Sequence, residues 1–567
     1  MSASDPRLVI VEPCLEPSAP GAAGSHAGRF VSALLGVAGQ RRCTIVARRG
    51  FVAGAGIPEE CAVQATLPFG PHSKVTAAGE LDRLDERGRR RFRPELPWAA
   101  WHRQRRREER IEGFARGVLP ALADLRAGDV VFVTTASELE AAGLARALAR
   151  SPLPVGIGCH VLFHTAIERG FRTDRPRQVR RLERVRRLLA GAVHEAAPHR
   201  LAFHATTPEL AAQYTRLGVA PCGVLPYPVV VPPPPPGQRS AAGPLRVAAL
   251  GDARPEKNSH RLAGIVDAVA ARPVLAAAVT FAVQCNPGFA ATSTAPGHEA
   301  VRCCLAELGD RPSVELVDGP LDDAAYIDQL RRADVALLAY DQDRYRTRLS
   351  AILLEALVAG AVPIVTGGGW MARQLAGAQA DHVARIAAGA ASQRLGLVRA
   401  MTVRHPGLAV RCAVPAGTTA LVVDVAWACD GTDALAEPPL RLACATDDDD
   451  APPLPATVAC APSAGRTTAV LFPLRPVATP RTVTVHVGPV RAAAEVAIDR
   501  IAIDALAGGA PPPAGAAGVI VDDVADVPAA LAEVARHADH YRHAAAALGG
   551  AVGAVHGPAA LLERLVP

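Results

Sequence analysis

Lysine, methionine and aromatic residues are scarce in this chain. Aromatic residues make up 4% of its 567 residues, and only Lys74 and Lys257 among the 61 basic residues are lysines. Arginine therefore carries nearly all of the positive charge, so its abundance alone does not indicate a function. No apolar run reaches about 18 residues without a charge or a helix breaker, which argues against a membrane span.

Cysteine is sparse for a metal or disulfide protein. The 12 cysteines form no C-x-x-C pair, and Cys303 and Cys304 are adjacent within a helical pattern. Structural zinc sites and disulfide-rich secreted domains need closely patterned cysteines. The N-terminus carries Asp5 and Pro6 and runs directly into a strand-like segment, unlike a signal peptide. We therefore expect a cytoplasmic protein with reduced core cysteines and no metal.

The length and the apolar content of 50% predict three or four domains with sizeable cores. Strand-like and helical segments alternate in the first part, as in a parallel sheet. The expected strands there cover residues 8–13, 43–49, 129–136, 154–163 and 201–207, and a helix covers 26–37. A second alternating series runs from 245 to 367 and suits a doubly wound sheet.

Two interruptions divide the chain further. The proline-rich stretch 226–244 predicts an extended linker, because a proline run fits neither a helix nor a central strand. From about residue 395, some eight short β-rich runs predict a β-sandwich or jelly roll. A strand-like VIVDD at 519–523 and helical patterns then follow, so the β module reads as an insertion into the second α/β domain. The predicted division is 1–225, 226–244, 245–392, 393–507 and 508–567.

The segment Gly251–Asn258 directly follows a predicted strand, where ligands bind in such sheets. Gly251 would let backbone approach a ligand, and Arg254 and Lys257 offer two cations that suit a diphosphate. The alternative is a solvated Arg-Glu-Lys turn. About 100 residues later, a polar loop leads into a helix whose first turn can bind phosphate, with Glu355 one turn in. Glu355 would need a partner among apolar residues: a ribose diol or a nearby arginine.

These motifs, LGDARPEKN and YRTRLSAILLEALVAGAVPIVTGGGW, together resemble the donor-binding half of GT-B glycosyltransferases of the retaining family-4 type. The first strand, glycine loop and helix in VEPCLEPSAPGAAGSHAGRFVSALL and the segment near the end in VIVDDVADVPAALAEVARHADHYRHAA are similar to the same family. The resemblance covers about 7–390 and 518–567. It implies an α/β fold of two Rossmann-like domains, here with an all-β jelly-roll-like insertion in the C-terminal one. It also implies a first domain that binds the acceptor.

The resemblance implies the roles of individual residues. Arg254 and Lys257 would bind the nucleotide diphosphate and stabilise the departing charge without a metal, and Glu355 would hold the ribose. Glu355 matches the second glutamate of the family's E-x7-E motif, whereas Thr347 stands where the first is expected. The implied donor-binding set is completed by residues at the helix start and in the glycine loops: Gly24, Ser25, Gly251, Thr347, Ser350 and Leu353.

Histidines of the first domain are further candidates. His160 and His164 lie in GCHVLFH at the end of a predicted strand, and the resemblance implies a catalytic histidine near the transferred sugar in this region. His26 in GSHAGRF is a weaker candidate. A histidine at a strand end is otherwise a structural residue with satisfied hydrogen bonds. The family needs no strong protein nucleophile, so we assign none.

Arginine-rich helical segments could face an anionic membrane. Residues 172–187 hold eight arginines against two acids, and apolar residues recur at helical spacing within 178–190. Trp98 and Trp101 beside the RQRRREER run would suit the same interface. The plainer alternative is a core-packed helix with a solvated face. Nucleic acid is not expected as a partner, because the sequence has no such binding motif.

The inserted module gives few functional signals. EVAIDRIAID resembles the last strand of galactose-binding-like jelly rolls, but the region offers mainly Trp427 and Phe472 as aromatic sugar contacts. Four consecutive acids, Asp447–Asp450, are either a calcium loop or a solvated loop. We treat the module as an accessory domain with an unknown ligand.

We therefore expect an enzyme that moves a sugar from a nucleotide-diphosphate sugar to a hydroxyl of a glycan or lipid-linked acceptor, with retention. It needs no cofactor, since the nucleotide sugar is a substrate. The cytoplasm is the expected location, with the inner face of the membrane as a candidate contact. The alternative is a catalytically inactive scaffold that binds glycan or protein, which Thr347 favours. A sugar-nucleotide epimerase, which shares the fold, is a third reading.

Overall fold

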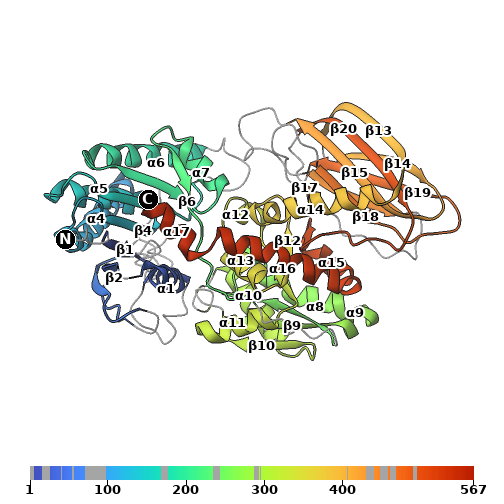
Figure 1. Cartoon of the computed structure of the whole chain (residues 1–567), viewed down its shortest axis with the longest axis horizontal. Coiled ribbons are helices and arrows are strands. Elements are labelled where there is room, and N and C mark those ends of the chain that lie inside the picture. The colour runs from blue at the N-terminus through green and yellow to red at the C-terminus, as the bar shows by residue number, and fades with distance from the viewer. Residues whose placement is uncertain are drawn as a thin grey trace. The chain divides into compact units, whose positions relative to one another are not determined.

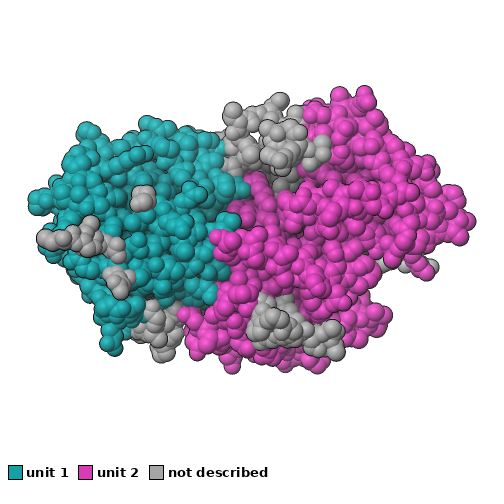
Figure 2. Space-filling model, in the orientation of Figure 1, with its two compact units in different colours: residues 1–230, 555–567 teal, residues 231–554 magenta. Residues whose placement is uncertain are grey.

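The computed structural model of the chain is shown in Figure 1. It describes residues 6–15, 26–39, 41–53, 57–69, 97–167, 176–233, 243–286, 291, 293, 295–404, 406–428, 440–446, 457–459, 468–489 and 495–566. The chain forms two compact units (Figure 2). Unit 1 comprises Met1–Val230 and Val555–Pro567, and unit 2 comprises Val231–Ala554.

Unit 1 is built on a parallel seven-stranded sheet in the order β3-β2-β1-β4-β5-β6-β7. Its strands are β1 (Leu8–Val11), β2 (Cys43–Arg48), β3 (Ala62–Leu67), β4 (Val130–Ala136), β5 (Gly158–Phe163), β6 (Leu201–Ala205) and β7 (Cys222–Val224). Its helices are α1 (His26–Ala38), α4 (Pro97–Leu122), α5 (Glu138–Arg150), α6 (Pro176–Glu195), α7 (Pro208–Thr215) and α17 (Pro558–Leu565). The predicted alternation is confirmed, and β3 and β7 are additional strands at the two edges.

The two faces of this sheet carry different helices. Val9 and Val131 share one core with residues of α4, α5, α6 and α7. Successive strand residues point to opposite faces, and Phe132 accordingly meets Phe30 of α1 with ring centroids 6.2 Å apart. Helix α17 packs against α1. The end of the chain thus completes the core of unit 1.

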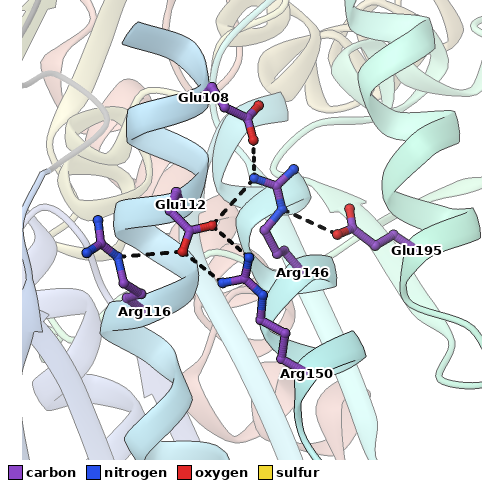
Figure 3. Close-up of polar contacts among 6 residues, drawn as sticks. All are labelled: Glu108, Glu112, Arg116, Arg146, Arg150 and Glu195. Atoms are coloured by element: carbon purple, nitrogen blue, oxygen red, sulfur yellow. Dashed lines mark hydrogen bonds and ion pairs between the residues drawn. The ribbon is translucent and has the colours of Figure 1, made fainter. Parts of the chain in front are cut away.

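Ion pairs join three helices on the outside of unit 1 (Figure 3). Arg146 of α5 pairs with Glu108 of α4 and with Glu195 of α6, the latter at 3.3 Å. Glu112 of α4 forms ion pairs with Arg150 at 2.8 Å and with Arg116 at 3.6 Å. Arginines of α5 thus link this helix to both of its neighbours, α4 and α6, through ion pairs.

Unit 2 contains a second parallel sheet, in the order β10-β9-β8-β11-β12-β21. Its strands are β8 (Leu245–Ala249), β9 (Val279–Cys285), β10 (Val314–Asp318), β11 (Val335–Leu338), β12 (Val362–Thr366) and β21 (Val519–Val521). Its helices are α8 (Leu262–Ala270), α9 (Pro273–Ala278), α10 (Pro296–Leu308), α11 (Asp323–Arg332), α12 (Gln342–Tyr345), α13 (Ala351–Val358), α14 (Trp370–Ala388), α15 (Val527–Arg536) and α16 (Ala538–Val555). The prediction of a second parallel α/β sheet is confirmed.

An all-β module lies between α14 and β21. Its strands are β13 (Ala391–Arg404), β14 (Leu408–Val414), β15 (Thr418–Ala428), β16 (Leu440–Thr446), β17 (Thr457–Ala459), β18 (Thr468–Pro473), β19 (Arg481–Pro489) and β20 (Glu495–Ala507). They form two antiparallel four-stranded sheets, β13-β20-β15-β18 and β14-β19-β16-β17. The first and last strands are neighbours, with Ala391 opposite Ala507. A small apolar cluster that includes Val383 of α14 and Leu471 of β18 joins the module to the α/β part of unit 2.

The first residues of the predicted linker are packed. Tyr227 is 2% exposed, and its backbone N–H donates to Nδ1 of His556 at 3.1 Å within unit 1. Val229 donates to the carbonyl of the same histidine at 2.8 Å. Residues 234–242 of the linker lie outside the described part of the chain.

One helical stretch in the described residues, Ala538–Leu565, is long and apolar enough to cross a membrane by length and composition. It comprises α16 and α17. Tyr541 and Ala545 of α16 and Leu561 of α17 are nevertheless fully buried in the protein core. A Cβ on Gly549 would lie 2.0 Å from the carbonyl oxygen of Leu357, so glycine allows α16 to contact the end of α13 closely. Of the most apolar 18-residue window in this stretch, 28% is buried.

Candidate functional site

The parallel strands of unit 2 bring their carboxyl ends to one edge of the sheet, and the predicted diphosphate loop lies there. Gly251 follows β8 with φ of +86°, a conformation that glycine adopts without strain. Its N–H donates to Oε1 of the buried Gln284 of β9 at 2.6 Å. Asn258 ends the loop's 3₁₀ turn in the left-handed region and donates to the carbonyl of Ala339, after β11, at 2.8 Å. The loop is thus fixed to both neighbouring strands.

Lys257 points back over Gly251. A Cβ on Gly251 would lie 2.7 Å from Nζ of Lys257 and 2.8 Å from Cδ1 of Ile352, a residue of α13. The ammonium also lies 5.7 Å from the ring centroid of Tyr340, close enough for a cation–π contact. Burial, and secondarily the charge of Arg254, lower the pKa of Lys257 to about 8, whereas acids that include Glu355 oppose the shift. The glutamate predicted from a distant motif is therefore close enough to act on the charge of the lysine.

Glu355 lies in α13 with 2% of its surface exposed. Its Oε2 accepts a hydrogen bond of 2.6 Å from the hydroxyl of Tyr326 in α11. A buried carboxylate is costly without such donors. The sequence left a ribose or an arginine as the partner, and in the structure a tyrosine fills part of that role.

The other residues of this motif surround the start of α13. Ser350 is its N-cap and accepts from the backbone N–H of Leu353 at 3.4 Å. Thr347 is 3% exposed and lies three residues before that cap. The sequence predicted that Gly251, Lys257 and the start of α13 would lie at one edge of the sheet. In the structure they do lie together there.

Arg254 was predicted to bind a phosphate, but in the structure it already has an acidic partner. Its guanidinium pairs with the carboxylate of Asp252, whose Oδ1 also accepts from Asn286 at 2.7 Å. The Arg254 side chain is half exposed. A small cavity of about 30 Å³, large enough for one water, is lined by Gly251, Asp252 and Lys257 among others.

The two histidines of unit 1 have different positions. His160 lies in the middle of β5, and its Nδ1 is 3.0 Å from Nε2 of His204 on β6. The rings stack at 5.2 Å between centroids. Burial, aided by His160, lowers the pKa of His204 to about 4, and burial also lowers the pKa of His160. The two rings thus contact each other across β5 and β6, and a catalytic role of His160 stays a prediction.

His164 follows β5 at the carboxyl edge of the unit 1 sheet. Its Nε2 lies 2.7 Å from the backbone carbonyl of Thr134, at the end of β4. The side chain of Thr134 donates to Glu12, which is 1% exposed and follows β1. Glu12 is a candidate that sequence reasoning missed. The available signal was a glutamate directly after an apolar strand.

The remaining residues predicted from the sequence are either outside the described part of the chain or buried. Gly24 and Ser25, and the side chains of His26, Trp98 and Trp101, lie outside the described residues, as do Asp447–Asp450. Trp427 and Phe472 are buried in the core of the β module, so they cannot form the exposed sugar platform considered above. No group of three or more metal-ligating side chains occurs among the described residues.

Comparison with known proteins gives distant likenesses only. No family model matches the chain, and no curated protein does. Among solved structures, a UDP-forming trehalose-phosphate synthase from Burkholderia xenovorans is similar at a TM-score of 0.42 and 11% identity, over 66% of this chain and 86% of that one. The sucrose-phosphate synthase from Thermosynechococcus elongatus is similar at 0.42 and 14%, over 68% and 90%. These likenesses are too distant to assign a function, which we argue from the site.

Proposed function

We propose that the protein is a GT-B glycosyltransferase that takes its sugar from a nucleotide-diphosphate donor bound at the carboxyl edge of the unit 2 sheet. The observation that carries this proposal is the meeting of Lys257 and α13 above Gly251, with Glu355 in the same helix. A cation, a glycine without a side chain and a helix start are the parts that bind a diphosphate. The carboxylate of Glu355 suits the hydroxyls of a ribose.

In this proposal, Lys257 and Arg254 stabilise the negative charge that develops on the leaving diphosphate. The N-terminal N–H groups of α13 add donors beside Ser350. Retention of configuration and a glycan or lipid-linked acceptor are the finer parts of the proposal, supported by the family resemblance. His164 is the proposed catalytic histidine of unit 1.

The test is binding of nucleotides by the purified full chain. We expect one nucleoside diphosphate, and its sugar conjugates, to raise the melting temperature among a panel of UDP, GDP and ADP compounds. Lys257→Ala and Glu355→Gln should abolish this rise while the protein stays folded. Two matched controls in the same unit should keep it: Arg311→Ala, which breaks a surface pair with Asp267, and Glu315→Gln, which breaks one with Arg246. Full binding by both site variants would refute the assignment.

The second candidate is a scaffold without catalysis. Thr347 in the first glutamate position of the motif favours it. Calorimetry separates the two, because a scaffold need bind no nucleotide sugar, and analysis of products without an acceptor separates an epimerase from a transferase.

The β module is proposed to be an accessory jelly roll. Counted from β13 as 1 to β20 as 8, its sheets have the orders 1-8-3-6 and 2-7-4-5, which supports two interleaved Greek keys. Contact of α6 with an anionic membrane stays a prediction. Co-sedimentation with vesicles that contain anionic lipid would test it, with neutral vesicles as the control.

A further inference from the structure

Glu12 is a buried carboxylate in unit 1, at the edge of the sheet where the parallel strands end. Its Oε1 accepts from the backbone N–H of Cys14 at 2.7 Å. Its Oε2 accepts from the hydroxyls of Thr134 at 2.7 Å and Thr135 at 2.8 Å. Three donors therefore hold one carboxylate that is 1% exposed. Burial of a charged carboxylate costs free energy, and the hydrogen bonds from several donors offset that cost and fix the position of the carboxylate.

These bonds tie the end of β1 to the end of β4. The Thr134 hydroxyl has one proton and two acceptors in reach, Oε2 of Glu12 at 2.7 Å and the carbonyl of Val11 at 3.1 Å. Glu12 is the closer acceptor and, when ionised, the stronger one. The carboxylate thereby fixes the position of Thr134 across two neighbouring strands.

The backbone carbonyl of the same Thr134 holds His164. A carbonyl oxygen only accepts hydrogen bonds, so the 2.7 Å contact requires the proton on Nε2 of His164. In the neutral ring, Nδ1 is then the basic nitrogen. The ring of His164 also meets that of Phe30 edge-on, with centroids 6.5 Å apart.

We propose that Glu12 is a positioning residue for His164: through Thr134 it fixes the carbonyl that sets the tautomer and orientation of the imidazole. The catalytic use of His164 rests on the proposed function above, whereas its tautomer does not. Partners of this kind commonly decide which ring nitrogen of a histidine carries the proton.

The same sheet offers a matched control at its opposite edge. Asp129 is 5% exposed and immediately precedes β4. It accepts from the backbone N–H groups of Arg7 and Arg126, both at 2.8 Å. It is therefore a buried, hydrogen-bonded carboxylate that links the starts of the same two strands, away from His164.

The test is the tautomer of His164, read from the nitrogen-15 shifts of its side chain at pH 8 in the deuterated full chain. The signals are assigned by their loss in His164→Gln. We expect a single Nε2–H form in the wild type and a mixture with the Nδ1–H form in Glu12→Ala and Thr134→Val. Glu12→Gln and Thr134→Ser keep a link between the two residues and should retain the single form, as should Asp129→Ala.

Each other outcome overturns the proposal. It fails if the wild type shows the Nδ1–H form, if Thr134→Val and Glu12→Ala leave the tautomer unchanged, or if Thr134→Ser or Asp129→Ala changes it equally. Should Glu12→Ala not fold, the Thr134→Val and Thr134→Ser pair decides alone.

Turnover of the nucleotide sugar identified by the melting test gives a second reading. We expect Thr134→Val to lower kcat about ten-fold with an unchanged KM for the donor, and Thr134→Ser to restore it. An inactive wild type would refute the proposed function, while the tautomer measurement would still decide the role of Glu12.

Discussion

Arg254 and Asp252, two residues apart in the loop after β8, form an ion pair with each other. The arginine proposed to bind a diphosphate is therefore already neutralised by a carboxylate of its own loop. Asn286 holds that carboxylate in place from the end of β9. A diphosphate has to compete with Asp252 for the guanidinium.

We predict that Asp252→Asn tightens the binding of the nucleoside diphosphate. The substitution removes the competing charge but keeps the shape of the side chain. Because the pair is partly exposed, the gain should be modest, about two- to five-fold in Kd. Calorimetric titration measures it. Asp318→Asn, at the end of the edge strand β10, changes the net charge equally and should leave Kd unchanged; weaker binding in Asp252→Asn would contradict the competition.

We predict that nucleotide affinity falls above pH 8. Burial and the nearby Arg254 lower the pKa of Lys257 to about 8, so the free protein loses this cation as the pH rises through that value. A bound diphosphate favours the charged form, and Kd should therefore rise about ten-fold per pH unit above 8. Lys257→Arg stays charged throughout. A flat profile for the wild type would show that Lys257 does not bind the phosphates.

We predict that Tyr326→Phe weakens both the fold and the binding of the nucleoside. It leaves Oε2 of the buried Glu355 without its 2.6 Å donor, which should cost about 1–3 kcal/mol of unfolding free energy. Tyr214→Phe is the control, since it removes a tyrosine hydroxyl that donates to the backbone carbonyl of Thr165 in unit 1 at 3.1 Å. Urea denaturation should detect both losses, and calorimetry should detect weaker binding in Tyr326→Phe alone.

We predict a distinct contribution of Glu12 to the dependence of stability on pH. Burial raises its pKa above the ordinary 4.5, against the opposing hydrogen bonds from Thr134, Cys14 and Thr135. A raised carboxyl pKa means that the folded protein binds the proton more tightly than the unfolded chain. The associated stability is full below about pH 4.5 and is lost as the pH rises through the raised pKa. Denaturation of Glu12→Gln across this range should lack that decline, whereas Asp129→Asn should retain it.

The sequence predicted the layout of the fold because its signals are local. The alternation of apolar strands and helices located β1, β4, β8 and β11, and period-two runs marked the module between β13 and β20. The edge strands β3 and β7 were not predicted, because β3 is largely half-exposed and β7 has only three residues. The glycine and lysine motif after β8 also indicated that the proposed donor loop and the start of α13 lie at one edge, because strand ends in a parallel sheet share that edge.

The pairings within the site could not be read from the sequence. Which partner a charged side chain takes depends on contacts between distant segments, as with Tyr326 and Glu355. Arg254 was predicted as a phosphate ligand, and nothing in the order of residues shows that it pairs with Asp252. Glu12 was not predicted as a site residue, because its burial and its hydrogen bonds depend on two threonines over 120 residues away in the chain.

The entry and exit of the β module are two paired strands, since Ala391 on β13 lies opposite Ala507 on β20. The chain therefore enters and leaves the β module at adjacent positions, and the residues that flank the module lie close together. A short glycine–serine linker from Gly389 to Gly508 would therefore replace the module, so its binding properties would change without a change in the proposed nucleotide site.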